Sequence, residues 1–343
     1  MYIPVKFSDT IEKDELDIEP TTFKTLKLKE RDVEEFLRRN INIIFEDEET
    51  LIVVGQQVRT AARGISDLTA IDSEGSIVLI EIKRDASDIK GRAEAFEFQA
   101  IRYAASYAKI QTPEEVVELI YSTYIEKHKN EYDLGELTPT ERARRDLDQF
   151  LKNNDALRTF NGKQRILLVA SSFDEQTLSA VAWLISNNVD ISCFTITPVI
   201  IGEQSFLQID KILPPATLDE FYVGLAHTSP IGQLSTGASK VGTKKTFLPR
   251  MNRLFEWELI RPGTKIKIRS HPDSEAEVVN EKTVNFKNHK MTYNQWGQKV
   301  TGWSSINIYE WTLLLDKNKT LSELRAEKMD ELEAEKMQTA LND

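Results

Sequence analysis

The stretch RGISDLTAIDSEGSIVLIEIKRD, residues 63–85, decides the fold class of this chain. Two apolar, strand-like runs flank the turn sequence DSEG at 72–75, so we expect a β-hairpin. Because successive side chains of a strand point to opposite faces, Glu81 and Lys83 share the face that Ile77 begins. An acid and a lysine therefore replace apolar residues at the end of one strand face.

A second carboxylate belongs to the same hairpin. Asp67 stands 14 residues before Glu81 with one turn between them, so the hairpin brings the two side chains together. Two carboxylates and the carbonyl oxygen of Ile82 form a hard, oxygen-rich site suited to Mg²⁺ or Mn²⁺. Lys83 is placed to position a water or to stabilise charge on a phosphate. An isolated Glu-x-Lys pair is usually solvated, so this prediction depends on the motifs around it.

The segments around the hairpin predict an α/β domain. Apolar residues recur at helical spacing before the hairpin and again after it, and short, fully apolar runs of the kind found in buried strands follow. The predicted order is helix, hairpin, helix, strand, helix, strand, with a charged helical stretch at 112–160. The main predicted elements are helices at 28–45, 93–108 and 175–185 and strands at 51–54, 64–72, 76–83, 165–171 and 190–201.

Three motifs around the hairpin resemble those of the PD-(D/E)xK nuclease superfamily, in its RecB-like and NucS-like branch. They read Gly64-Ile65-Ser66-Asp67, Glu81-Ile82-Lys83 and Gln99-Ala100-Ile101-Arg102-Tyr103. The resemblance is close over residues 24–110 and implies a restriction-endonuclease-like core, in which helices flank a mixed sheet. It also implies an acidic residue on the helix before the sheet. We choose Glu34 for that position, with Glu30 one turn earlier as the alternative.

The resemblance implies a role for each matching residue. The implied catalytic residues are Asp67, Glu81, Lys83, Gln99, Glu34 and Tyr103. The implied ligands of Mg²⁺ or Mn²⁺ are Asp67, Glu81, the carbonyl of Ile82, and Glu34. Tyr103 fits a packed core position equally well, whereas Gln99 on an otherwise apolar helix face needs a hydrogen-bonding partner.

Residues 249–319 contain four of the five tryptophans and follow a segment, 227–248, whose Gly, Ser, Thr and Lys content is typical of a linker. Thr301-Gly302-Trp303 and Trp311 resemble the pattern of RAMA-type modules (restriction enzyme adenine methylation-associated). The Ser-rich helix start of that pattern is replaced by Met291-Thr292-Tyr293-Asn294. The resemblance implies a small α+β domain that reads DNA, with modified adenine as one candidate. We interpret Trp303 and Trp311 as core residues rather than base contacts.

Charge is unevenly distributed along a chain of net charge −11. Between Lys240 and Trp303 there are 13 basic and 6 acidic residues, a net +7, so the remainder carries −18. A basic module on an acidic chain is typical of contact with nucleic acid, although a solvated charged surface gives the same count. The candidate phosphate contacts are Lys265, Lys267, Arg269, Lys287, Lys290 and Lys299.

The composition excludes several classes of protein. The apolar runs are far shorter than the ~20 residues that a membrane-spanning helix needs. Cys193 is the only cysteine, so an intrachain disulfide and a cysteine-based zinc site are excluded. The first residues lack the basic start and apolar core of a secretory signal, and we expect a cytoplasmic protein without a membrane partner.

These observations predict five segments. They are an N-terminal arm (1–23), a nuclease domain (24–226), a linker (227–248), a RAMA-like domain (249–319) and an acidic helical tail (320–343). The predicted function is that of a metal-dependent DNA endonuclease of restriction or phage-defence type, with DNA as its partner. A non-catalytic DNA-binding adaptor and an RNA nuclease stay open as alternatives, as does assembly into a homodimer.

Overall fold

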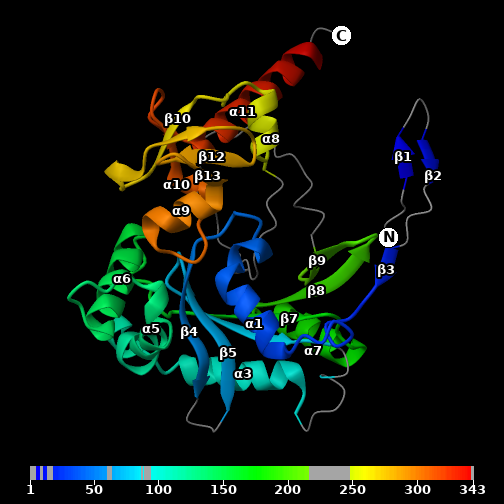
Figure 1. Ribbon diagram of the computed structural model, residues 1–343, viewed down its shortest axis with the longest axis vertical. Coiled ribbons are helices and arrows are strands. Elements are labelled where there is room, and N and C mark those ends of the chain that lie inside the picture. Colours follow the sequence, from blue (N-terminus) through cyan, green and yellow to red (C-terminus); the bar gives the residue numbers. More distant parts are fainter. Residues whose placement is uncertain are drawn as a thin grey trace.

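Two β-sheets, each accompanied by helices, make up the chain in the computed structural model (Figure 1). The structure describes residues 5–7, 11–13, 18–59, 64–85, 88, 94–215 and 248–340. The larger sheet is mixed and belongs to the N-terminal two thirds of the chain, and the smaller sheet is antiparallel and belongs to the C-terminal third. The α/β fold class is therefore observed, together with a second sheet that has its own helices.

The larger sheet has the strand order β3-β8-β7-β6-β5-β4, and β9 pairs with β8. Strand β5 runs antiparallel to both of its neighbours, β4 and β6, whereas β6, β7 and β8 are parallel. Central strand β6 is buried along its whole length, which explains its nearly continuous apolar sequence. The strands are β3 (Ile18–Pro20), β4 (Leu51–Arg59), β5 (Ile65–Asp72), β6 (Ile77–Lys83), β7 (Gln164–Ala170), β8 (Ile191–Ile201) and β9 (Gln204–Leu213).

Helices cover this sheet and its β4 edge. Helix α1 (Glu30–Arg39) packs on β5 and β6, α3 (Phe96–Tyr107) packs on β6 and β7, and α7 (Glu175–Ser186) packs against α3 and β8. A helical segment after α3 packs beside β4. Its elements are α4 (Pro113–Val116), the π-helical turn η2 (Val117–Tyr121), α5 (Ser122–Lys127), η3 (Lys129–Glu131) and α6 (Pro139–Asn153). A short 3-10 turn, η1 (Ile41–Ile44), joins α1 to β4.

Local sequence explains where several of these elements begin. The Thr138 side chain accepts a hydrogen bond from the amide of Glu141, and Pro139 occupies the first turn, so the predicted break at this proline is the start of α6. In the β5–β6 turn, Asp72 accepts hydrogen bonds from the amides of Glu74 and Ser76, and Gly75 has a φ of +83°. The DSEG sequence therefore forms the predicted hairpin.

The smaller sheet has the order β13-β12-β11-β10-β14-β15. Its strands are β10 (Lys265–Ile268), β11 (Ala276–Val278), β12 (Thr283–Phe286), β13 (His289–Thr292), β14 (Thr312–Leu314) and β15 (Lys319–Thr320). Its helices are α8 (Met251–Glu256), η5 (Pro272–Ser274), α9 (Tyr293–Thr301), α10 (Ile308–Trp311) and α11 (Leu321–Ala340), the last formed by the acidic tail. Trp296, Trp303 and Trp311 are buried in this unit.

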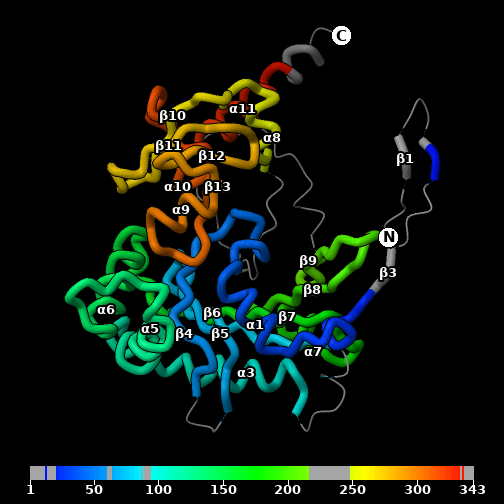
Figure 2. Tube along the Cα trace, viewed as in Figure 1, coloured from blue at the N-terminus to red at the C-terminus, as the bar shows by residue number. Residues whose placement is uncertain are grey.

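The two units contact each other at the start of β4 (Figure 2). Leu51 and Ser305 form an antiparallel bridge, and the amide of Val53 donates a hydrogen bond to Ser304 Oγ at 2.9 Å. The carboxylate of Glu48 accepts hydrogen bonds from Arg325 at 3.0 Å and from Arg250 at 3.1 Å. Backbone pairing and partly buried ion pairs therefore join segments that are more than 200 residues apart in the sequence.

Several predicted boundaries fall partly on residues that the structure does not describe. Of the predicted linker 227–248, only residue 248 is described. Of the predicted arm 1–23, β1 (Val5–Phe7) and β2 (Ile11–Lys13) pair with each other, and β3 joins the larger sheet. Within the described ranges, each helix is either too short or too polar to cross a lipid bilayer.

Trp303 tests the contact between the units. Its side chain is 4% exposed, and its ring lies 5.2 Å from that of Phe150 on α6 and 4.7 Å from that of Trp311. We expect Trp303→Ala to lower the free energy of unfolding by about 3–5 kcal/mol, because it leaves a cavity between packed rings. Urea denaturation of the full chain measures this. The matched control is Trp183→Ala, a tryptophan that is 65% exposed, for which we expect a change within about 0.5 kcal/mol. Similar effects of both substitutions would contradict the packing role.

Candidate functional site

Asp67 and Glu81 meet at the open end of the β5–β6 hairpin. The register pairs Leu68 with Ile80, which places Asp67 beside Glu81 at the next position. Asp67 Oδ2 accepts a hydrogen bond from the amide of Ile82 at 2.8 Å, and the amide of Asp67 donates to Glu81 Oε1 at 3.4 Å. Asp67 is 7% exposed and Glu81 is fully buried. Each strand therefore holds the carboxylate of the other in place.

The Lys83 ammonium group lies among oxygen atoms of the same site. Its Nζ atom is 2.6 Å from the carbonyl oxygen of Ile82, 3.8 Å from Asp67 Oδ2 and 3.5 Å from Glu30 Oε1. The group also lies 5.2 Å from the centre of the Phe96 ring on α3. Although the side chain is only 2% exposed, these oxygens and the ring face stabilise its positive charge.

Gln57 of β4 joins Glu34 of α1 to this pair. Gln57 lies opposite Asp67 in the β4–β5 register, and its Nε2 donates hydrogen bonds to Glu34 Oε2 and to Asp67 Oδ1, the latter at 3.3 Å. Its φ of +55° lies in the left-handed region, which is uncommon for a residue other than glycine. Gln57 was not among the predicted site residues, because the apolar run of this strand ends at Val54 and the polar residues that follow give no sign that the strand continues.

Both candidate acids of α1 reach the site, but through different partners. Glu34 is bonded to Gln57 and is buried, whereas Glu30 approaches Lys83. Burial and the negative charge of Asp67 raise the pKa of Glu34 from 4.5 to about 7. Glu34 therefore gains and loses its proton near neutral pH.

The raised pKa of Glu34 predicts how stability depends on pH. A carboxyl group whose pKa is higher in the folded than in the unfolded chain stabilises the fold while it is protonated. This contribution is lost as the pH rises from about 4.5 to 7. In EDTA, we expect the full chain to lose up to about 3 kcal/mol of unfolding free energy over this range through Glu34, and Glu34→Gln to remove that loss.

Glu35→Gln is the control for this measurement. A hydrogen bond with Arg38 lowers the pKa of Glu35 to about 2, so Glu35 stays ionised over the whole range. We expect this substitution to lower stability by a similar amount at each pH. Urea midpoints recorded from pH 5 to pH 8 distinguish the two variants. An unchanged pH slope in Glu34→Gln would show that Glu34 does not titrate there.

Gly64, Gln99 and Tyr103 form a second contact group beside the carboxylates. Tyr103 Oη accepts hydrogen bonds from Gln99 Nε2 and from the amide of Ile65, both at 3.1 Å. A Cβ atom at Gly64 would lie 2.1 Å from Tyr103 Cε1, so only glycine fits against the ring. One turn further along α3, the Tyr107 hydroxyl bonds Ser66 and Thr69 of β5. These contacts fix α3 to the strand that carries Asp67.

The Gly64–Tyr103 contact predicts a non-additive pair of substitutions. We expect Gly64→Ala to cost about 1–3 kcal/mol, because the new methyl group overlaps the tyrosine ring. In the Tyr103→Ala background the same substitution should cost much less, because the ring is gone. Urea unfolding of the two single variants and the double variant gives the coupling energy. A coupling near zero would show that the ring does not constrain position 64.

The oxygen donors at the hairpin end fit a small divalent ion. Asp67, Glu81 and the Ile82 carbonyl supply hard oxygen atoms of the type that Mg²⁺ and Mn²⁺ prefer. In the part of the chain that the structure describes, no three His, Cys, Asp or Glu side chains form a metal-binding group by themselves. The groups that could hold such an ion are therefore two carboxylates and one main-chain oxygen.

An open cleft lies next to these residues, between α1, β4 and α5. Glu34 and Gln57 line it together with Glu30, so the cleft borders both Asp67 and Lys83. The remaining lining residues are Arg31, Asp32, Glu35, Gln56, Lys127 and His128. Asp67, Glu81 and Lys83 do not line this cleft themselves, and Gln57 and Glu30 connect them to it.

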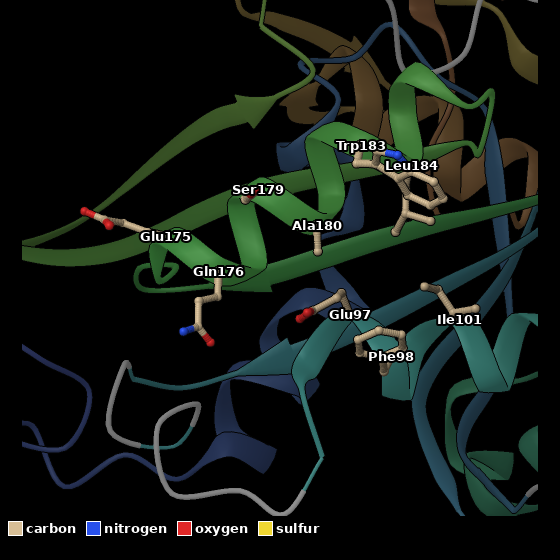
Figure 3. A pocket seen from close by; sticks show the side chains of 9 residues that line it. All are labelled: Glu97, Phe98, Ile101, Glu175, Gln176, Ser179, Ala180, Trp183 and Leu184. Atoms are coloured by element: carbon tan, nitrogen blue, oxygen red, sulfur yellow. The ribbon is translucent and has the colours of Figure 1, made fainter.

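A second groove runs between α3 and α7 and is more apolar (Figure 3). Phe98 and Trp183 line it and are 61% and 65% exposed, respectively. At its base Glu97 accepts a hydrogen bond from the hydroxyl of Thr177. None of the residues predicted for catalysis lines this groove, so it is distinct from the cleft at the carboxylates.

The predicted phosphate-contact residues all belong to the C-terminal unit. Lys265, Glu277, Asn285 and Lys290 occupy successive cross-strand positions on one face of the smaller sheet. The residues Lys265, Arg269, Lys287, Lys290 and Lys299 are exposed, and Lys267 is half-buried. Lys265 pairs with Glu275 at 3.1 Å, and Arg269 lies 4.5 Å from the centre of the Trp311 ring. The structure thus places these residues in a unit other than the one that carries Asp67 and Glu81.

Comparison with known proteins adds no relative. A scan against models of protein families finds no match, and neither do searches of curated protein sequences and of solved structures.

Proposed function

We propose that this chain is a metal-dependent nuclease that hydrolyses phosphodiester bonds in DNA. The observation that carries the proposal is the convergence of Asp67, Glu81 and Lys83 around the carbonyl oxygen of Ile82. Two fixed carboxylates, a main-chain oxygen and a buried ammonium group are the chemical groups that metal-assisted phosphodiester hydrolysis requires. The motifs that resemble the PD-(D/E)xK superfamily support the same reading.

Each residue of the site has a defined part in this proposal. Asp67, Glu81 and the Ile82 carbonyl would hold Mg²⁺ or Mn²⁺, with Glu34 beside them. When bound, the ion polarises the phosphodiester and lowers the pKa of a coordinated water. The Lys83 ammonium stabilises negative charge that develops on the phosphate. Gln99 and Tyr103 act on the site from α3, where the Tyr103 hydroxyl holds the first amide of β5.

The wider architecture supports a restriction-endonuclease-like core with a DNA-reading module. The larger sheet combines an antiparallel β4–β5–β6 meander with parallel β7 and β8, and helices accompany it. We propose that the C-terminal unit is RAMA-like and binds DNA through its exposed basic residues. Together these units would form an endonuclease of restriction or genome-defence type.

Cleavage of plasmid DNA by the purified full chain tests the proposal. We expect cleavage in Mg²⁺ or Mn²⁺ and none in EDTA, with methylated and unmethylated plasmids compared side by side. Asp67→Asn, Glu81→Gln and Lys83→Met should each slow cleavage by about 10²-fold or more, because each removes a metal ligand or the cation at the phosphate. Glu175→Gln, which changes a carboxylate of the α3–α7 groove, should cleave at the rate of the unchanged chain.

Thermal melting of each variant separates loss of chemistry from loss of folding. A cleavage rate in Asp67→Asn equal to that of the unchanged chain would contradict the role of Asp67. DNA binding without cleavage in any divalent ion would instead support a non-catalytic adaptor. Cleavage of RNA but not of DNA would change the substrate class and keep the site.

A further inference from the structure

The cleft beside the carboxylates has a second wall that the proposed chemistry does not use. Lys127 and His128, at the end of α5, line the cleft together with Gln56 and Gln57 of β4. Gln57 donates a hydrogen bond to Asp67 at 3.3 Å, which links this wall to a candidate catalytic carboxylate. The segment that contains α5 lies outside the motifs that suggested a nuclease.

Two nitrogen donors on this wall converge on a single oxygen atom. Lys127 Nζ and His128 Nε2 each lie 2.9 Å from Gln56 Oε1. The His128 ring is held against Tyr124, with 4.7 Å between ring centres. Burial and the charge of Arg38 lower the pKa of His128, so its neutral form donates through Nε2 to the glutamine carbonyl. The arrangement presents a cation and an N–H group to one acceptor position.

The charge of Lys127 acts on Glu34, which lines the same cleft, and partly offsets the rise in the Glu34 pKa. The hydrogen bond of Lys127 goes to the neutral amide of Gln56, so the ammonium has no carboxylate hydrogen-bond partner among the described residues. The other cations near the cleft are paired, since Arg31 lies 3.8 Å from Asp32 and Arg38 binds Glu35. Lys127 is also exposed, so an anion in the cleft can reach it.

We propose that Lys127 and His128 bind a phosphate of the DNA strand that enters this cleft, with a phosphate oxygen taking the place of the Gln56 carbonyl. A phosphate oxygen is a stronger acceptor than an amide carbonyl for a lysine ammonium, because both partners are charged. Gln56 and Gln57 are adjacent in β4, so Lys127 and His128 contact the residue next to the one that donates to Asp67. This inference rests on the proposed nuclease function, which directs the strand toward Asp67.

Binding of a fluorescein-labelled DNA duplex in EDTA, measured at several salt concentrations, tests the contact with Lys127. We expect Lys127→Gln to weaken binding and to reduce the slope of log affinity against log salt by about 0.9, the loss for one phosphate contact. Lys127→Arg should restore the slope, and His128→Gln should weaken binding without changing it, because His128 is neutral. Lys129→Gln is the matched control, since Lys129 lies two residues away, is exposed and pairs with Glu126.

Cleavage kinetics in Mg²⁺ distinguish a phosphate contact from an indirect effect. A substrate contact raises KM with little change in kcat, and we expect this of Lys127→Gln. Suppose that Lys127→Gln and the unchanged chain show the same salt slope and that the unchanged chain cleaves DNA. This result would overturn the phosphate contact and leave the nuclease proposal intact. A reduced slope in a chain that cleaves nothing would overturn the nuclease and keep the contact. A lower kcat at unchanged KM would overturn the phosphate contact, because Lys127 would then act through Gln56.

Discussion

The hydrogen bond from the amide of Ile82 to Asp67 Oδ2 is the interaction on which the candidate site depends. It lies where the β5–β6 hairpin opens, and the amide of Asp67 returns a hydrogen bond to Glu81. Both carboxylates are thereby fixed by the main chain of the opposite strand rather than by flexible side chains. Because β6 is the central strand of the larger sheet and is buried along its length, the surrounding core holds this geometry in place.

Grouping Asp67, Glu81 and Glu34 away from water is electrostatically unfavourable, and the structure offsets it locally. The Lys83 ammonium lies against Asp67 and the Ile82 carbonyl, and Gln57 donates to both Glu34 and Asp67. The raised pKa of Glu34 shows that this compensation is incomplete. The divalent ion that we propose for this site would offset part of the remaining repulsion between the carboxylates.

Much of this arrangement follows from local sequence. The turn at 72–75 and the alternation of the two strands are short-range features, and they place Asp67, Glu81 and Lys83 together. The tight contact between Gly64 and Tyr103 joins two of the motifs that suggested a nuclease.

The sequence did not predict the extent of β4, because a register shift between Val53 and Gly55 and the left-handed Gln57 interrupt its pattern. Strand β9 was also missed, since its apolar residues include the exposed Phe206 and Leu207. The cleft wall at Lys127 and the contact between Ser305 and Leu51 depend on tertiary packing across many residues, which periodicity cannot reveal.

Strand β4 is anchored at both ends, by the C-terminal unit at Leu51 and by the carboxylates at Gln57. Between these two anchors β4 has one residue more than β5, and the irregularity between Val53 and Gly55 accommodates it. Inserting a second extra residue there would shift every later residue of the strand by one register position and turn its side chain to the opposite face. Gln57 would then leave Asp67 even though the docking of the C-terminal unit was kept. A further insertion should consequently be far less tolerated in this short interval than a substitution or the loss of the extra residue, although none of the candidate catalytic residues lies within it.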